Sequence, residues 1–286
     1  MERVLRPERK NSSKDLMLFI LVLALSGIEN LIAEVLPEFQ LGPIEVGISS
    51  FIFVPIVLCI LFDSFWAALA APIGELVFAD LILGEFGGLG EFEEVILLTM
   101  GLYIAGKMVK DVTNRKQIAA AALFAFIFQD LIGTFIDMTK VWVGIEDFEA
   151  ISGLPESVFA LEMIDFLVEF AVTGIIFGLI PTLYFAPRLY GKIEPLLGIK
   201  PRLIEKGAAL NVPIRLIGGA IIAVIAAAAV SMLSGAGFNI IEWEPEFLDQ
   251  FGQWYIWVPI TIAAIVAIVV IWLGKSNNGE GQDINV

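Results

Sequence analysis

Histidine is absent from this chain of 286 residues, and Cys59 is its one cysteine. The absence of histidine excludes Ser-His and Cys-His nucleophile pairs, histidine-bearing zinc sites and b- or c-type haem ligation. A single cysteine excludes a disulfide within the chain, and its place in an apolar stretch favours a packed core side chain. We therefore expect no catalytic residues, no enzyme activity and no cofactor.

Basic residues are also scarce: 17 Lys and Arg against 32 Asp and Glu give a formal net charge of −15. This balance argues against nucleic acid as a partner, because nucleic-acid binding needs a basic surface. Apolar residues make up 58% of the chain, and the mean hydropathy is +0.87. Such a composition is typical of proteins whose main solvent is lipid. We expect an all-α polytopic membrane protein.

Eight apolar stretches have lengths compatible with crossing a bilayer, which takes about 20 residues. They lie at 15–35, 47–62, 64–83, 94–109, 117–137, 157–187, 212–233 and 254–273. The first six form a predicted transmembrane core (15–187), and the last two are additional helices (212–273). Between them lies a basic, amphipathic linker (188–211), which is predicted to follow the membrane surface. Segments 1–14 and 274–286 are the predicted N-terminal segment and C-terminal tail.

The distribution of Lys and Arg predicts the orientation. Sixteen of the 17 lie on one predicted side of the membrane, and the exception is Lys140 in the predicted loop 138–156. Because short loops rich in Lys and Arg stay in the cytoplasm, we expect both termini to be cytoplasmic in a multi-pass protein of the cell membrane.

Carboxylates inside a membrane are costly and normally face an interior cavity. Nine acids within the predicted spans are candidates for such a cavity, and all nine lie in the outer half: Glu29, Glu34, Glu75, Asp80, Asp130, Asp137, Glu162, Asp165 and Glu169. The last three are spaced i, i+3, i+7 and share one helical face. We predict an outward-facing substrate-binding chamber formed by Glu29, Glu75, Asp130, Glu162, Asp165 and Glu169. Glu34, Asp80 and Asp137 are assigned to the wet rim or to hydrogen bonds between helices.

A chamber of this kind, with Lys140 as its one nearby cation, either keeps protons on some carboxyls or binds a cation. Candidate ligands are an ammonium, an amidinium, a thiazolium-like heterocycle or a hard divalent metal, so a metal site is left open. A glycine-rich loop with Gly84, Gly87, Gly88 and Gly90 lies at the predicted mouth, either as a gate or as a tight connection between two spans.

The run at 70–81 (AAPIGELVFADL), followed by the glycine loop, resembles the third helix and loop of the substrate-binding S components of energy-coupling-factor transporters. The resemblance implies a subunit of a vitamin or metal importer, powered by a transmembrane coupling protein and two ATPases. By motif it carries over Glu75 and the neighbouring loop residues. The chain departs from the family in its two extra helices, in lacking an Ala-x-x-x-Ala pattern in its first span, and in lacking the histidine-bearing N-terminus of nickel and cobalt binders. An organic cation or another small nutrient is therefore the favoured cargo.

Two other functions agree with the same residues. One is a stand-alone cation- or proton-coupled transporter, which would move its substrate without an ATPase. The other is a non-transporting subunit of a larger membrane complex. A lipid bilayer and a small-molecule ligand are the partners common to the transport hypotheses.

Overall fold

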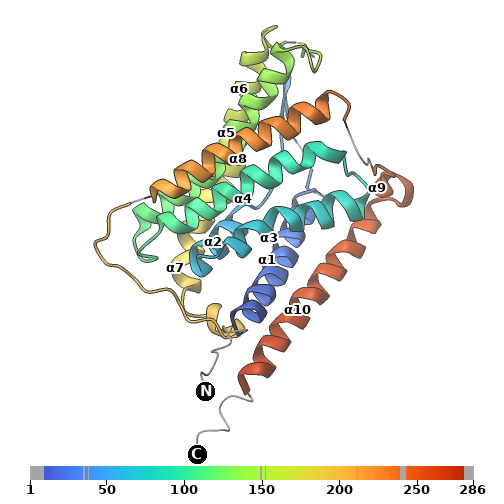
Figure 1. The fold of residues 1–286 in the computed structure, drawn as a ribbon. Coiled ribbons are helices and arrows are strands. Elements are labelled where there is room, and N and C mark those ends of the chain that lie inside the picture. Colours follow the sequence, from blue (N-terminus) through green and yellow to red (C-terminus); the bar gives the residue numbers. More distant parts are fainter. Residues whose placement is uncertain are drawn as a thin grey trace, which may run out of the picture.

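The computed structural model describes residues 10–34, 36–37, 39–148, 150–151, 153–210, 212–238 and 243–279. Most of the predicted N-terminal segment, position 211 of the predicted linker and the end of the predicted tail lie outside the described residues. In chain order the helical elements are α1 (Lys10–Glu34), α2 (Phe53–Phe62), α3 (Phe65–Glu75), η1 (Leu76–Leu81), η2 (Gly88–Gly90), α4 (Glu91–Met108), α5 (Arg115–Trp142), α6 (Val158–Glu169), η3 (Phe170–Leu179), α7 (Ile180–Leu189), η4 (Glu194–Leu197), α8 (Ile214–Gly235), α9 (Phe247–Phe251), η5 (Gln253–Ile256) and α10 (Trp257–Gly279) (Figure 1). A small antiparallel hairpin pairs β1 (Phe39–Leu41) with β2 (Ile44–Val46).

Within the described residues, five helical stretches are long and apolar enough to cross a bilayer: Ser13–Glu34, Arg115–Trp142, Val158–Leu189, Ile214–Gly235 and Gln253–Lys275. The other three predicted spans are helical but shorter or more polar. Helix α2 has ten residues, α3 changes to a π-helix after eleven, and α4 begins with three glutamates. The fold is that of a helical membrane protein, and a total of eight crossings remains a prediction.

The helices pack in two layers (Figure 1). In the first layer, α8, α4, α3, α1 and α10 lie in that order, each in contact with the next. The second layer contains α5, α2 and the continuous rod α6–η3–α7. Helices α8 and α10 therefore lie at opposite edges of one bundle. They are integral parts of it and do not form a separate pair.

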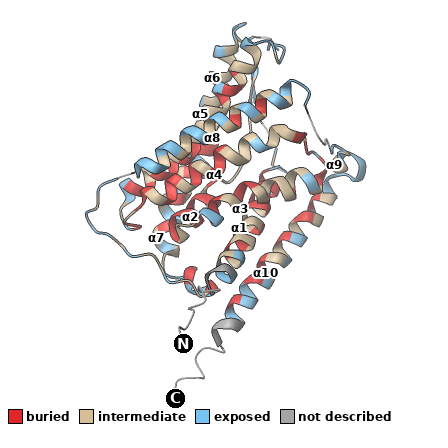
Figure 2. Cartoon of the chain, in the orientation of Figure 1, coloured by how far each residue is buried: buried red, intermediate tan, exposed pale blue. Residues whose placement is uncertain are grey.

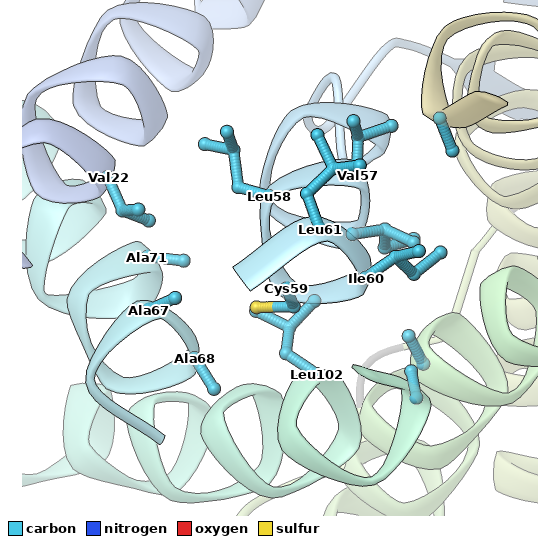
Figure 3. Packing of buried hydrophobic residues seen from close by; sticks show 14 of the residues in the cluster. Val22, Val57, Leu58, Cys59, Ile60, Leu61, Ala67, Ala68, Ala71 and Leu102 are labelled. Atoms are coloured by element: carbon cyan, nitrogen blue, oxygen red, sulfur yellow. The ribbon is translucent and has the colours of Figure 1, made fainter. Parts of the chain in front are cut away.

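Helix α2 occupies the centre of the bundle. Its sequence is apolar throughout, and every residue from Pro55 to Leu61 is buried (Figures 2 and 3). Small residues bring the neighbours close: Ala67, Ala68 and Ala71 of α3 are fully or almost fully buried beside α2. A Cβ added at Gly106 of α4 would lie only 2.7 Å from the Cys59 carbonyl oxygen, so glycine is required there. This close backbone approach is the usual means of packing helices in lipid.

The outer surface of the bundle has the opposite character. Ile214, Ile217, Ile221, Ile222 and Ile225 of α8 are all exposed. All six tryptophans are exposed as well, at positions 66, 142, 243, 254, 257 and 272. Exposed isoleucine rows and exposed tryptophans are expected where lipid covers a helix and where aromatic rings lie near the headgroups.

The segment before α2 corrects the predicted span at 47–62, because the helix begins only at Phe53. The Phe51 amide donates a hydrogen bond to Glu29 Oε2 of α1 at 2.6 Å. The Ser49 hydroxyl donates to Glu169 Oε1 of α6 at 2.7 Å. Glu29 thus satisfies a backbone amide that a longer helix would have bonded internally, and Glu169 binds a side chain of the same non-helical segment.

The described part of the linker after α7 contains one short helical turn, η4, and the chain then returns to the end of the bundle where α2 and α4 terminate. That this linker follows the membrane surface remains a prediction. Arg202 Nη1 donates to the carbonyl oxygens of Ile60 and Gly106, each at 2.9 Å. Its Nη2 lies 3.6 Å from Asp63 Oδ2, and the other oxygen of this carboxylate, Oδ1, lies 2.9 Å from Lys107 Nζ. One guanidinium therefore serves the last carbonyls of two helices, α2 and α4.

We predict that Arg202→Ala lowers the free energy of unfolding by about 2–4 kcal/mol, because two carbonyls and one carboxylate lose a charged donor. Arg202→Lys should recover little of this loss, since a single ammonium lacks the guanidinium's fork of donors. Thermal unfolding of the purified protein in detergent measures both. Lys192→Ala, an exposed change in the same linker, is the matched control. Equal unfolding temperatures for Arg202→Ala and Lys192→Ala would contradict the predicted role of Arg202.

Candidate functional site

An acidic cavity of about 540 Å³ lies where α4, α5, α6 and α8 meet. Its described lining contains eight carboxyl side chains: Glu91, Glu93, Glu94, Asp130, Asp137, Glu146, Glu162 and Asp165. Lys140 is the one basic side chain among these lining residues. We call this space the acidic cavity.

Helical periodicity explains how four elements supply the wall. On α5, Asp130, Gly133, Thr134 and Asp137 follow the i, i+3, i+4, i+7 spacing of one face, and all four line the cavity. On α6, Glu162 and Asp165 are three residues apart, and on α8 the lining residues Ser231, Ser234 and Gly235 are similarly spaced. The acids of α4 lie in its first turn, where the positive end of the helix dipole favours negative charge.

Ion pairs and hydrogen bonds satisfy some of the carboxylates that line the cavity. Lys140 Nζ pairs with Asp137 at 2.7 Å and with Glu146 at 2.8 Å. Gln129 Nε2 donates to Glu94 Oε1 at 2.6 Å. Asp130 Oδ2 is buried and has no hydrogen-bond partner among the residues described. The lysine therefore offsets two of the eight carboxylates, and the cavity retains a strongly negative character.

Three of the six predicted ligand-binding residues, Asp130, Glu162 and Asp165, line the acidic cavity. The Glu169 carboxylate accepts the Ser49 hydroxyl and neighbours Asp130, and it is not among the lining residues of the cavity.

Glu29 and Glu75 are not among the lining residues of this cavity. Glu29 accepts the Phe51 amide, and Glu75 is the last residue of α3, which packs against both α1 and α4. Only part of the predicted chamber therefore corresponds to the acidic cavity.

Sequence reasoning missed the three glutamates of α4, because the predicted span 94–109 excludes Glu91 and Glu93 and has Glu94 only as its first residue. The helix begins at Glu91, directly after the glycine loop. A cluster of acids following a glycine turn is a recognised signal for a helix N-terminus and could have placed them. Asp137, assigned to the rim, lies in the cavity wall and pairs with Lys140.

The glycine loop is held in place by the connection between α8 and α10. Phe86 and Trp243 exchange two backbone hydrogen bonds of 3.0 and 2.9 Å, and the Glu246 amide donates to the Gly84 carbonyl. Gly84 and Gly88 have φ of +84° and +91°, which favours glycine at both positions. Gly90 lines the acidic cavity, and a Cβ at Gly87 would lie 3.0 Å from a Glu91 carboxylate oxygen. These contacts agree with the glycine loop being a tight connection between two helices. Its alternative role as a gate to the cavity remains a prediction.

Replacement of Lys140 is expected to change the stability of the protein and its affinity for a cation in opposite directions. We predict that Lys140→Gln lowers the free energy of unfolding by about 1–2 kcal/mol, because two carboxylates lose their partner. The same change makes the cavity more negative and should tighten the binding of a cation. Thermal unfolding and titration calorimetry measure the two quantities on one sample. If both stability and cation affinity fell, the acidic cavity would not be the cation site.

Glu85 in the glycine loop gives the chain a pH dependence outside the predicted spans. Burial first, and then the negative charges of Glu34, Asp249 and Glu246, raise the pKa of this carboxyl above its ordinary value. The folded protein therefore keeps a proton at a pH where the unfolded chain has released it, and Glu85 makes stability fall as the pH rises through that range.

We predict that Glu85→Gln weakens the decline in unfolding temperature between pH 5 and pH 8. The exposed change Glu156→Gln should leave the decline as it is in the unmodified protein. A pH series of thermal unfolding curves for the three proteins makes the comparison. An unchanged slope for Glu85→Gln would mean that this loop is not the source of the pH dependence.

No curated protein matches the chain, and no solved structure matches it. The model of one family of unknown function, DUF8171, matches residues 17–283. This range extends from α1 into α10 and includes all four helices that form the acidic cavity. The chain therefore belongs to the DUF8171 family.

Proposed function

We propose that this protein captures a small organic cation from the outer side of the cell membrane, as the substrate-binding subunit of an importer. The observation that carries the proposal is the acidic cavity, in which eight carboxyls and one lysine surround about 540 Å³. Pockets for small molecules typically enclose a few hundred to about 1,000 Å³. Positive ligands are favoured because seven of the eight carboxyls are held on helices and Lys140 offsets only two of the eight.

The size of the electrostatic effect supports a charged ligand. Two opposite charges 4 Å apart attract by about 4 kcal/mol at an effective dielectric constant of about 20. The buried Asp130 Oδ2, which lacks a partner among the described residues, adds an acceptor that a ligand N–H would satisfy. An ammonium or amidinium supplies both the charge and the donors.

An organic cation is favoured over a metal ion. Among the described residues, no three carboxylate, cysteine or histidine groups are arranged so that they could hold a metal. A divalent metal needs several oxygens within about 2.0–2.6 Å, whereas an organic cation distributes its charge over a larger volume. The metal that the sequence left open is therefore not part of the proposal.

The importer role rests on the resemblance of 70–81 and the glycine loop to energy-coupling-factor S components, and on the outward orientation predicted from Lys and Arg. It requires a transmembrane coupling protein and ATPases as partners. A mild-detergent purification from native membranes, followed by mass spectrometry, tests this part. Recovery of ATPases supports an importer subunit, and recovery of the protein alone favours a self-sufficient transporter.

A second function, proton-coupled transport without an ATPase, is favoured by the contact between Asp130 and Glu169. Two neighbouring carboxyls beside a cation site offer a place where a proton can be exchanged for the cation. Liposomes that contain only this protein and an imposed pH gradient test it. Cation flux that follows the gradient would select this mechanism over the importer subunit.

We predict that the double change Glu162→Gln, Asp165→Asn weakens the binding of ammonium and amidinium compounds at least tenfold, or about 1.4 kcal/mol. Both substitutions remove charge from the cavity wall and keep the side-chain shape. Titration calorimetry in detergent measures the affinity, and Glu156→Gln, an exposed acid outside the cavity, controls for net charge. Equal affinity in the double variant and the control would refute the cation site.

A further inference from the structure

A second cavity, of about 550 Å³, adjoins the acidic cavity on the outer side of the bundle. It lies between the β1–β2 hairpin, the segment after α5 and the first turns of α6. Glu146, Glu162 and Asp165 line both spaces, so the two cavities share a wall of three carboxylates. We call the second space the apolar cavity, for the reason given next.

Nine of the fourteen described lining residues of the second cavity are apolar, among them Ile44 of β2, Phe148 and Ile151 of the segment after α5, and Leu161 and Ile164 of α6. The polar remainder consists of the three shared carboxylates, Asp147 and Gln40. Phe148 and Ile151 are exposed in the structure, at 39% and 48%. Apolar side chains that remain exposed around a cavity are a common sign of a ligand surface.

The arrangement of α6 explains why the two cavities differ. Val158, Leu161 and Ile164 occur at intervals of three residues and line the apolar cavity, whereas Glu162 and Asp165 also reach the acidic one. Asp165 is exposed and stands at the boundary between them. A single ligand placed against Asp165 therefore has carboxylates on one side and apolar side chains on the other.

We propose that the ligand is an amphiphilic organic cation, with its charged end in the acidic cavity and an aromatic or aliphatic body in the apolar cavity. This inference rests on the proposed function and specifies the class of substrate for the same site. A small hydrophilic cation would leave the apolar cavity filled with water. A ligand with an apolar body removes that surface from water and gains affinity in proportion to the area buried.

The test uses three probes on the full-length protein in lipid nanodiscs: ethylamine, 2-phenylethylamine and 2-phenylethanol. The two amines carry the same ammonium charge, and the alcohol keeps the ring without the charge. We expect 2-phenylethylamine to bind at least tenfold more tightly than ethylamine, and the alcohol to bind at least tenfold more weakly than 2-phenylethylamine. Titration calorimetry supplies the three affinities.

Leu161→Ala should remove most of the tenfold advantage of 2-phenylethylamine and leave the affinity for ethylamine unchanged. Phe159→Ala is the matched control, because Phe159 lies on the same turn of α6 and lines neither cavity. Phe148→Ala, outside the helices, serves as a second variant if Leu161→Ala does not fold. Equal loss in the Phe159 control would overturn the assignment of the apolar cavity.

The outcomes separate this inference from the proposed function. Equal affinity for the two amines would overturn the amphiphilic ligand and leave cation capture standing. Absence of binding by either amine would overturn cation capture itself. Binding of 2-phenylethanol as tight as that of 2-phenylethylamine would overturn the inference as well, because a lipid chain or another neutral molecule would then be the occupant.

Discussion

Helix α2 is buried along most of its length, and backbone groups near both of its ends are satisfied by side chains from other parts of the chain. Glu29 accepts the amide of Phe51 before the helix, and Arg202 donates to the carbonyl of Ile60 near its end. These two side chains come from the first helix and from a linker late in the chain. Contacts with the central helix α2 therefore fix the positions of α1, α4 and the linker that contains Arg202. The remaining helices pack around these elements.

The same requirement divides the acidic residues into two groups. Glu29 and Glu169 bind backbone or hydroxyl donors near the start of α2 and so support the core. Within the described part of the chain, Glu162 and Asp165 accept no such backbone or hydroxyl hydrogen bond, and they line the acidic cavity. Asp130 lies between the groups, since it contacts Glu169 and also faces the cavity. A change of charge at Asp130 would therefore alter the electrostatic potential both in the cavity and at the segment before α2.

Periodicity and charge predicted much of this molecule from sequence. The helical stretches, the shared face of Glu162 and Asp165 and the cavity position of Asp130 all follow from local spacing. The start of α2 could not be predicted, because it depends on Glu29 and Glu169, which approach it only in the folded protein. The integration of α8 and α10 was missed for a similar reason: neither carries a deep acid, and packing contacts between distant helices leave no local pattern.

The adjacency of α1 and α10 has a consequence for how the protein is made. Helix α1 can contact α10 only after all the helices between them have been synthesised. Contacts between such distant segments slow folding, and the exposed side of α1 must meanwhile be covered by lipid or by an insertion factor. Closure of the bundle by α10 is therefore expected to be a late step of assembly, and mutations in that helix should reduce yield before they reduce ligand affinity.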